Sequence, residues 1–294
     1  MKYAAMESLR EKHSVRKMAK VLNIKESAFY QWRKREKEKD KKKIEQEKLV
    51  SEVRKIFDES RQTYGYRKVA NTLADEGTEM SEYKVRQIMR SNGMHPVTAI
   101  KYRPGKPAKA TGRYLDNLFN QDFSTTRLNE KWAGDITYIK TKIGWVYLVC
   151  IIDLHNKEIV GYAISKKADT ELVCRALSYA LIRRNITDKD LLTFHSDRGV
   201  QFASRRFQAM LSANGITGSM SKAGCPYDNA PVESFFSSAK RECIYRKEYS
   251  DITEVCKDIF DYIEVFYNRK RIQAGLGNKS PLAYRKDIEA QKAA

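Results

Sequence analysis

The hydrophobic pattern of this chain changes its period once, and that change limits which folds are open to it. Between about residues 14 and 93, apolar side chains recur at helical spacing. From about Asn129 the apolar runs are short and rich in β-branched and aromatic residues, as in strands. Residues 101–112 separate the two regions with two prolines, two glycines and four basic residues, which disfavour a packed core. We therefore place the main domain boundary there.

The pattern after Asn129 predicts a mixed sheet. Three strands are expected in a meander, followed by helices that alternate with two more strands and then by two helices. Strands covered by helices in this order indicate an α/β domain. The expected strands are 132–140, 145–153, 158–165, 191–195 and 216–220, and the expected helices are 170–184, 204–214, 231–245 and 251–268.

The N-terminal region has the spacing of a helix-turn-helix. Residues 14–35 read as two short helices, and the second ends in Arg33, Lys34 and Arg35. These three bases are candidate DNA contacts, although an ordinary helical hairpin with a solvated basic end fits the same spacing. The run 33–43, with eight bases and three acids, predicts a long exposed helix that continues to about residue 59.

A second helical module follows this long helix. Residues 64–67 are expected to form a turn, a helix covers 67–75, and Ser81 is placed to cap a third helix that ends near Gly93. Short helices with basic faces suit a plain or winged helix-turn-helix, in which Arg67 is a further candidate DNA contact. A helical adaptor is the alternative.

The charge balance narrows the class of partner. The chain has 294 residues, and 56 Lys and Arg against 37 Asp and Glu give it a net charge of +19. Such an excess favours a polyanion, nucleic acid first and a membrane surface second. No apolar run approaches the roughly 20 residues that span a bilayer, and no signal-peptide core follows Met1. Five cysteines without a Cys-x-x-Cys pair indicate reduced thiols in a cytoplasmic protein.

Three carboxylates lie in segments with different expected secondary structure. Asp135 lies within a strand-like run, Asp197 ends another, and Glu233 opens a helix-like run. An acid in a β-branched segment is unfavourable unless it is paired or binds a metal. Three carboxylates make a hard oxygen site for Mg²⁺ or Mn²⁺, and two such ions about 3.5–4 Å apart can promote phosphoryl displacement. Structural ion pairs are the alternative, because the chain has many acids.

Four sequence motifs favour the metal site. They are Trp132-Ala-Gly-Asp-Ile-Thr137, His195-Ser-Asp-Arg-Gly-Val-Gln-Phe202, 219–236 and Tyr267-Asn-Arg-Lys-Arg-Ile272. In this order the motifs closely resemble bacterial insertion-sequence transposases with the DDE integrase core, and most closely the second-reading-frame product of the insertion-sequence-three family. The resemblance covers about 129–285, and the motif Tyr64-Gly-Tyr-Arg-Lys68 extends it over most of the chain.

The resemblance implies a ribonuclease-H-like core in which Asp135, Asp197 and Glu233 bind metal, expected as two Mg²⁺ or Mn²⁺ ions. It also implies a basic residue two helical turns after the glutamate, which here is Lys240. Seven residues are close to two turns, so Glu233 and Lys240 share one helix face and Lys240 can meet a DNA phosphate.

The same resemblance implies DNA cleavage and strand transfer at the ends of an insertion element. Expected partners are the terminal repeats, target DNA and further copies of the chain in a dimer or larger synaptic complex. Relatives commonly gain a helix-turn-helix and leucine zipper from an upstream frame, and this chain has no sustained heptad repeat of its own. We expect a nucleoid-associated protein. A DNA-binding regulator that no longer cuts and a ribonuclease for RNA–DNA hybrids are the rivals.

The expected architecture is therefore an α/β catalytic core preceded by all-α modules. Its parts are an N-terminal helix-turn-helix with a basic helix, a second helical module, a basic linker, the integrase core and a tail, at 1–43, 44–100, 101–128, 129–285 and 286–294.

Residues around the acids have weaker assignments. Gly199 is expected to let the chain turn after Asp197. His195 is expected to lie behind the metal ligands or to be satisfied in the core rather than to bind metal itself. Residues 227–229 are expected to shape the loop before the helix that carries Glu233, with Asp228 as a cap or turn residue and a metal ligand as the alternative. Asp153 is expected as a turn residue. Packing roles are expected for two further side chains, Trp132 and Trp145.

Overall fold

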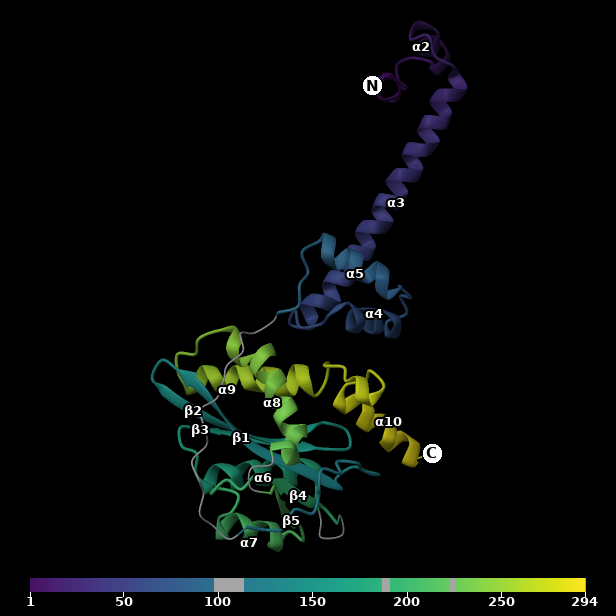
Figure 1. The fold of residues 1–294 in the computed structure, drawn as a ribbon. Helices are drawn as coiled ribbons and strands as arrows, with labels where there is room; N and C mark the ends of the chain where they lie inside the picture. Colours follow the sequence, from purple (N-terminus) through teal and green to yellow (C-terminus); the bar gives the residue numbers. More distant parts are fainter. Residues whose placement is uncertain (98–113, 187–190, 223–225, 294) are drawn as a thin grey trace. The chain divides into compact units, whose positions relative to one another are not determined.

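The computed structural model describes residues 1–97, 114–186, 191–222 and 226–293 (Figure 1). The boundary expected at 101–112 lies outside the described residues. The chain forms two compact units. The first consists of Met1–Glu59 and Val69–Met94, and the second of Ser60–Lys68 and His95–Ala294.

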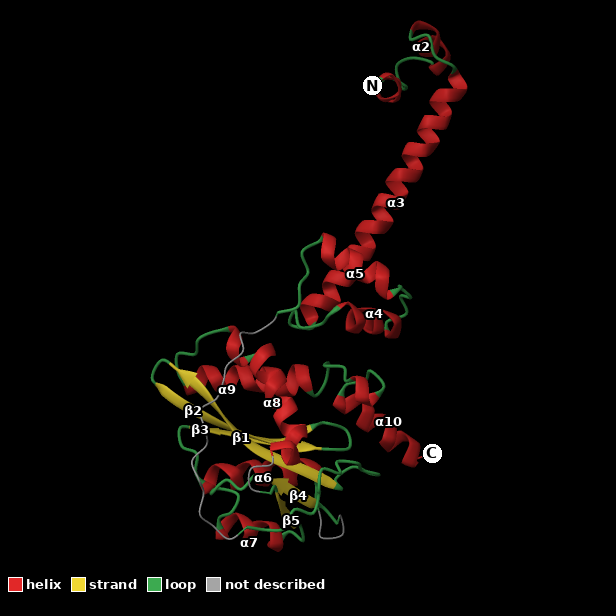
Figure 2. Cartoon of the chain, viewed as in Figure 1, coloured by secondary structure: helices red, strands yellow, loops and turns green. Residues whose placement is uncertain are grey.

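The first unit is helical, as the spacing predicts (Figure 2). The Oγ atoms of Ser14 and Ser81 accept hydrogen bonds from backbone N–H groups three residues later, so both serines cap a helix, which confirms the cap expected at Ser81. The long exposed helix is confirmed as α3, whereas α1 was not expected. The helices are α1 (Lys2–Ser8), α2 (Val15–Val21), α3 (Glu26–Glu59), α4 (Tyr66–Asp75) and α5 (Glu82–Ser91).

The second unit is built on a five-stranded sheet in the order β3-β2-β1-β4-β5. Strand β2 runs antiparallel to its neighbours β1 and β3, while β1, β4 and β5 pair in parallel. This arrangement is ribonuclease-H-like and confirms the predicted mixed sheet. The strands are β1 (Lys131–Thr141), β2 (Gly144–Asp153), β3 (Ile159–Ser165), β4 (Thr193–Ser196) and β5 (Thr217–Met220).

Helices cover both faces of this sheet (Figure 1). Helices α6 (Thr170–Arg184) and α7 (Arg205–Ala213) share an apolar core with one face, and α8 (Ala230–Glu242) lies with α9 (Ile252–Phe260) on the other. Helix α6 packs closely against β3 because Gly161 has no side chain. A Cβ there would lie 2.4 Å from the carbonyl oxygen of Ala176.

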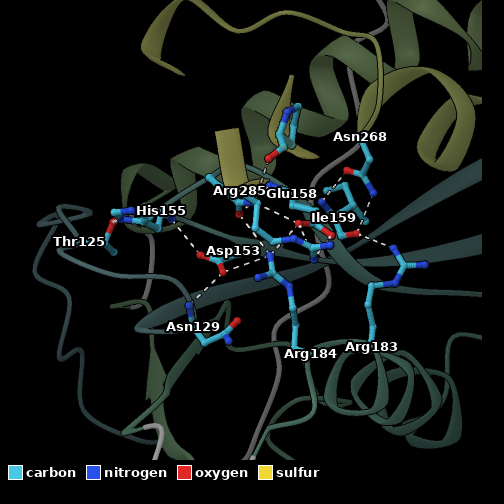
Figure 3. Close-up of polar contacts among 12 residues, drawn as sticks. Thr125, Asn129, Asp153, His155, Glu158, Ile159, Arg183, Arg184, Asn268 and Arg285 are labelled. Carbon is cyan, nitrogen blue, oxygen red and sulfur yellow. Dashed lines mark hydrogen bonds and ion pairs between the residues drawn. The ribbon is translucent and has the colours of Figure 1, made fainter. Parts of the chain in front are cut away.

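The C-terminal segment returns to the sheet. After α9 the chain continues through a π-helical stretch, Asp261–Tyr267, and reaches α10 (Pro281–Ala293), which includes most of the expected tail. The Asn268 side chain accepts from the backbone N–H of Ile159 and donates to its carbonyl, both at 3.0 Å (Figure 3). This amide therefore pairs with the start of β3 much as another strand would.

A buried ionic cluster joins the β2–β3 turn, α6 and α10 (Figure 3). A guanidinium nitrogen of Arg184 lies 2.8 Å from Glu158 and 3.4 Å from Asp153, and Arg285 lies 3.2 Å from Glu158. Asp153 also accepts hydrogen bonds from the backbone N–H groups of Asn129 and His155. Its predicted turn role is thus only part of its function, because the carboxylate is fully buried and ion-paired.

We predict that Glu158→Gln lowers the free energy of unfolding by about 3–5 kcal/mol, because it leaves the cation of Arg184 buried with too little opposite charge. The matched control is Asp287→Asn, which removes the acid from the exposed Lys279–Asp287 pair and should change it by less than about 1 kcal/mol. Urea titrations followed by circular dichroism measure both. Equal losses in the two variants would contradict the structural role of the cluster.

Candidate active site

Two of the three predicted acids lie where β1 and β4 separate. The parallel pairing of these strands runs from Lys131 opposite Thr193 to Gly134 opposite Ser196, and it ends there. The next residues are Asp135 and Asp197. Paired strands lie about 4.8 Å apart, so the two acids start from neighbouring backbone positions.

Gly134 allows this close approach of the strands. A Cβ at this position would lie 2.5 Å from the ring of Phe194, a side chain that is itself buried on β4. Gly134 therefore meets a packing requirement directly before the candidate carboxylate of Asp135.

The third acid, Glu233, is carried to the same place by the start of α8. The side-chain amide of Asn229 donates to the carbonyl oxygen of Gly134 at 3.4 Å, which anchors the beginning of the helix beside β1. Glu233 lies in the first turn of α8. Asp197 and Glu233 lie close enough to Asp135 for their charges to raise its pKa. Asp197 and Glu233 are exposed residues, and Asp135 is half-buried.

The electrostatics of the site reflect this crowding. Burial, with the charges of Asp197 and Glu233, raises the pKa of Asp135 to about 8, while a 2.7 Å hydrogen bond from the N–H of Ile136 opposes the rise. Asp197 and Glu233 keep exposed surface, but nearby protein atoms shield their carboxyl groups in part from water. This partial desolvation raises the pKa of Asp197 and, together with the charge of Asp197, that of Glu233. Among the described residues, no three His, Cys, Asp or Glu side chains already form a compact metal cluster.

Lys240 lies at the edge of this acidic region. Its ammonium is 5.8 Å from the centre of the Tyr138 ring, and its charge counteracts the rise in the pKa of Asp135. Burial lowers the pKa of Lys240 itself. The ring of Tyr138 also packs edge to face against Trp145, with ring centres 5.2 Å apart. Trp145 is 45% exposed, whereas Trp132 is fully buried. The packing role expected for both tryptophans holds fully for Trp132 alone.

The neighbouring residues are structural. The two ring nitrogens of His195 lie 2.8 and 3.1 Å from the hydroxyls of Ser219 and Ser221, which confirms that this histidine is satisfied in the core. Asp228 is buried and accepts from the side chains of Asn117 and Gln121 and from the N–H of Lys222.

Gly199 approaches Asp197 closely. Its N–H donates to Oδ1 of Asp197 at 2.9 Å, and a Cβ at Gly199 would lie 2.9 Å from that same oxygen. The glycine is therefore needed for the short contact with the acid.

The predicted DNA-contacting bases lie on helices. Arg33, Lys34 and Arg35 belong to α3, where Lys34 and Arg35 are exposed and Arg33 is half-buried and bonded to Glu7 at 3.2 Å. Arg67 is in the first turn of α4, with its guanidinium 5.7 Å from the centre of the Tyr66 ring. The assignment of these four bases to DNA stays a prediction.

Sequence comparison shows to which family the chain belongs. Residues 125–226 and 233–288 match integrase core domain families, and residues 43–102 match the HTH-like domain. Transposase InsF for insertion sequence IS3A of Escherichia coli (strain K12) is 35% identical over 281 residues, which are 96% of this chain and 97% of that protein. The chain belongs to the IS3 family of transposases.

Solved structures resemble this IS3-family protein at low identity. A chain of the simian T-cell lymphotropic virus intasome, solved with the PP2A regulatory subunit B56 gamma, has a TM-score of 0.43 and 15% identity over 72% of this chain and 69% of its own. The HTLV-2 integrase catalytic core domain in complex with magnesium has a TM-score of 0.35 and 17% identity over 52% and 93%.

The residues that sequence reasoning missed in this IS3-family member are side chains that join distant segments of the chain by hydrogen bonds. Asn229, which holds the start of α8, was assigned no more than a part in shaping a loop, and Arg271 and Asn268 were assigned no role. The sequence feature that could have identified them is their position within the motifs that carry the family resemblance. Spacing alone could not reveal their partners, because those partners lie far away in the sequence.

We predict that Asp135→Asn raises the free energy of unfolding by roughly 0.5–2 kcal/mol at pH 7 in buffer without divalent ions. A carboxyl group whose pKa is raised to about 8 must take up a proton on folding at pH 7 or stay charged beside Asp197 and Glu233, and the neutral amide avoids both costs. Asp153→Asn is the control, since it removes a buried acid that faces Arg184 and should destabilise the fold. Urea unfolding of both variants tests this. Destabilisation by Asp135→Asn would show that the three acids are not in conflict.

Proposed function

We propose that this chain is a DNA transposase that cuts phosphodiester bonds at the ends of an insertion element and joins the freed ends to target DNA. The observation that carries this proposal is the end of the β1–β4 pairing one residue before Asp135 and Asp197, with Asp197 and Glu233 near enough for their charges to raise the pKa of Asp135. Membership of the IS3 family, over nearly the whole length of the chain, supports the same reaction.

The donor set at this point fits a divalent cation. Carboxylate oxygens are the ligands that Mg²⁺ and Mn²⁺ prefer, and the mutual repulsion of three acids is relieved by a cation between them. One or two such ions would activate the attacking oxygen and stabilise the leaving oxygen. We assign the binding of these ions to Asp135, Asp197 and Glu233.

The chain orients two of these carboxylates through backbone hydrogen bonds. Oδ1 of Asp135 accepts from the N–H of Ile136, and Oδ1 of Asp197 accepts from the N–H of Gly199. Each bond sets the direction of the second oxygen of its carboxylate, and we assign that oxygen to the cation. To Lys240, whose charge acts on Asp135, we assign the role of holding a phosphate next to the bond that is cut.

The expected partners follow from charge and from the reaction. The net charge of +19 favours DNA, and the exposed basic run of α3 offers phosphate contacts along its length. Because two element ends must be held together, we propose a dimer or larger assembly, and an upstream-frame helix-turn-helix and zipper partner remains part of this proposal. No helix in the described parts of the chain combines the length and apolar character needed to cross a bilayer.

We predict Mg²⁺-dependent nicking of a supercoiled plasmid that carries the DNA flanking the gene on both sides. Asp197→Asn should lower the initial rate by about a thousandfold or more, because it removes one of three essential charges. Asp287→Asn, which changes an exposed acid on α10, should leave the rate within about twofold.

The same assay separates the rival functions. Wild-type nicking no faster than that of Asp197→Asn would favour a DNA-binding regulator that does not cut. Faster cleavage of an RNA–DNA hybrid than of the flanking duplex would favour a ribonuclease.

A further inference from the structure

Two of the sequence motifs, 64–68 and 267–272, have no part in the proposed chemistry, yet they contact each other within the second unit. The hydroxyl of Tyr64 donates to the carbonyl oxygen of Lys270 at 3.0 Å and accepts from the N–H of Ile272 at 2.8 Å. The Tyr64 side chain is buried, so its bonds hold the backbone on both sides of Arg271. The motif at 64–68 therefore holds the backbone of the motif at 267–272 in place.

Arg271 in turn holds the last residue of α8. Its guanidinium binds Glu242 with two hydrogen bonds, Nε to Oε2 at 2.8 Å and Nη2 to Oε1 at 2.7 Å. The hydroxyl of Tyr262 donates to Oε2 of the same carboxylate at 2.9 Å. A two-point contact between planar groups fixes orientation as well as distance, which a single contact with a lysine would not do.

The position of Glu242 on α8 makes this contact relevant to the acids. Glu242 follows Glu233 by nine residues, which is about half a turn out of phase, whereas Lys240 is almost in phase with Glu233. Arg271 thus holds one side of α8 while Glu233 and Lys240 project from the opposite side. Together with the bond from Asn229 to Gly134, the helix is anchored at both ends.

We propose that Tyr64, Arg271 and Glu242 form a positioning clamp that sets the rotation of α8 about its axis and so places Glu233 and Lys240 against Asp135. The clamp rests on the proposed function for its effect on rate. A rotation of 20° moves a side-chain end about 6 Å from the axis by about 2 Å. Displacements of about 1 Å at reacting groups can lower rates about a hundredfold.

A purely structural ion pair would also lower stability when it is broken, so the test needs a matched control. Arg184 supplies it. Its side chain is 4% exposed, against 11% for Arg271, and it pairs with Glu158 at 2.8 Å in the same unit, but it belongs to α6 and the ionic cluster. Arg271→Lys and Arg184→Lys make the same chemical change, keep the charge and lose the planar fork.

The first measurement is the single-turnover cleavage rate at saturating flanking DNA with Mg²⁺. We expect Arg271→Lys to lower it about 10- to 100-fold, with DNA affinity within about twofold, and Tyr64→Phe to lower it less. In combination with Lys240→Ala, the effect of Arg271→Lys should be smaller than on its own, because part of it acts through the position of Lys240, whereas the effect of Arg184→Lys should multiply in full. Multiplying effects for both arginines would overturn the proposal.

The second measurement does not depend on catalysis. Spin labels at Ser237→Cys on α8 and Lys140→Cys on β1, both exposed positions, report the distance between helix and strand in a background with Cys225 and Cys256 replaced by serine. We expect Arg271→Lys to shift or broaden the distance distribution by about 2 Å, and Arg184→Lys to leave it unchanged. If wild-type protein does not cut DNA, the proposed function fails, but an unchanged distribution in Arg271→Lys is what refutes the clamp.

Discussion

The parallel pairing between β1 and β4 is the constraint on which the rest of the site depends. It ends at Gly134 and Ser196, so the next residue on each strand is an acid. The ring of Phe194 occupies the space above Gly134 and makes any larger residue there incompatible with the approach of the strands. The packing of an apolar sheet therefore holds the carboxyl groups of Asp135 and Asp197 near each other, although they repel each other when both are ionised.

The third acid depends on a different set of contacts. Glu233 is carried by a helix that begins at the Asn229–Gly134 bond and ends at the Arg271–Glu242 pair. Buried ion pairs contribute little net stability, because desolvation offsets much of their attraction. Their value here lies in orientation, which explains why a charged pair, and not an apolar contact, holds the end of α8.

Periodicity was sufficient to predict most helices and strands, because each of these elements has a distinct apolar pattern in its own sequence. It could not place Asp153, whose partner Arg184 comes from α6, nor the contact of Tyr64 with residues 270–272, which spans about two thirds of the chain. The three acids were selected by resemblance, since each alone is an ordinary carboxylate. Strand register brings Asp135 beside Asp197, and the contacts of α8 carry Glu233; no local pattern contains either.

The most direct test of the account is where a divalent ion binds. Crystals grown with Mn²⁺ and measured at its absorption edge would locate the ion by anomalous scattering. The account predicts a peak about 2–2.5 Å from carboxylate oxygens of both Asp135 and Asp197, and loss of that peak in Asp197→Asn. A strong peak bound elsewhere, with Asp135 and Asp197 left without an ion, would contradict it.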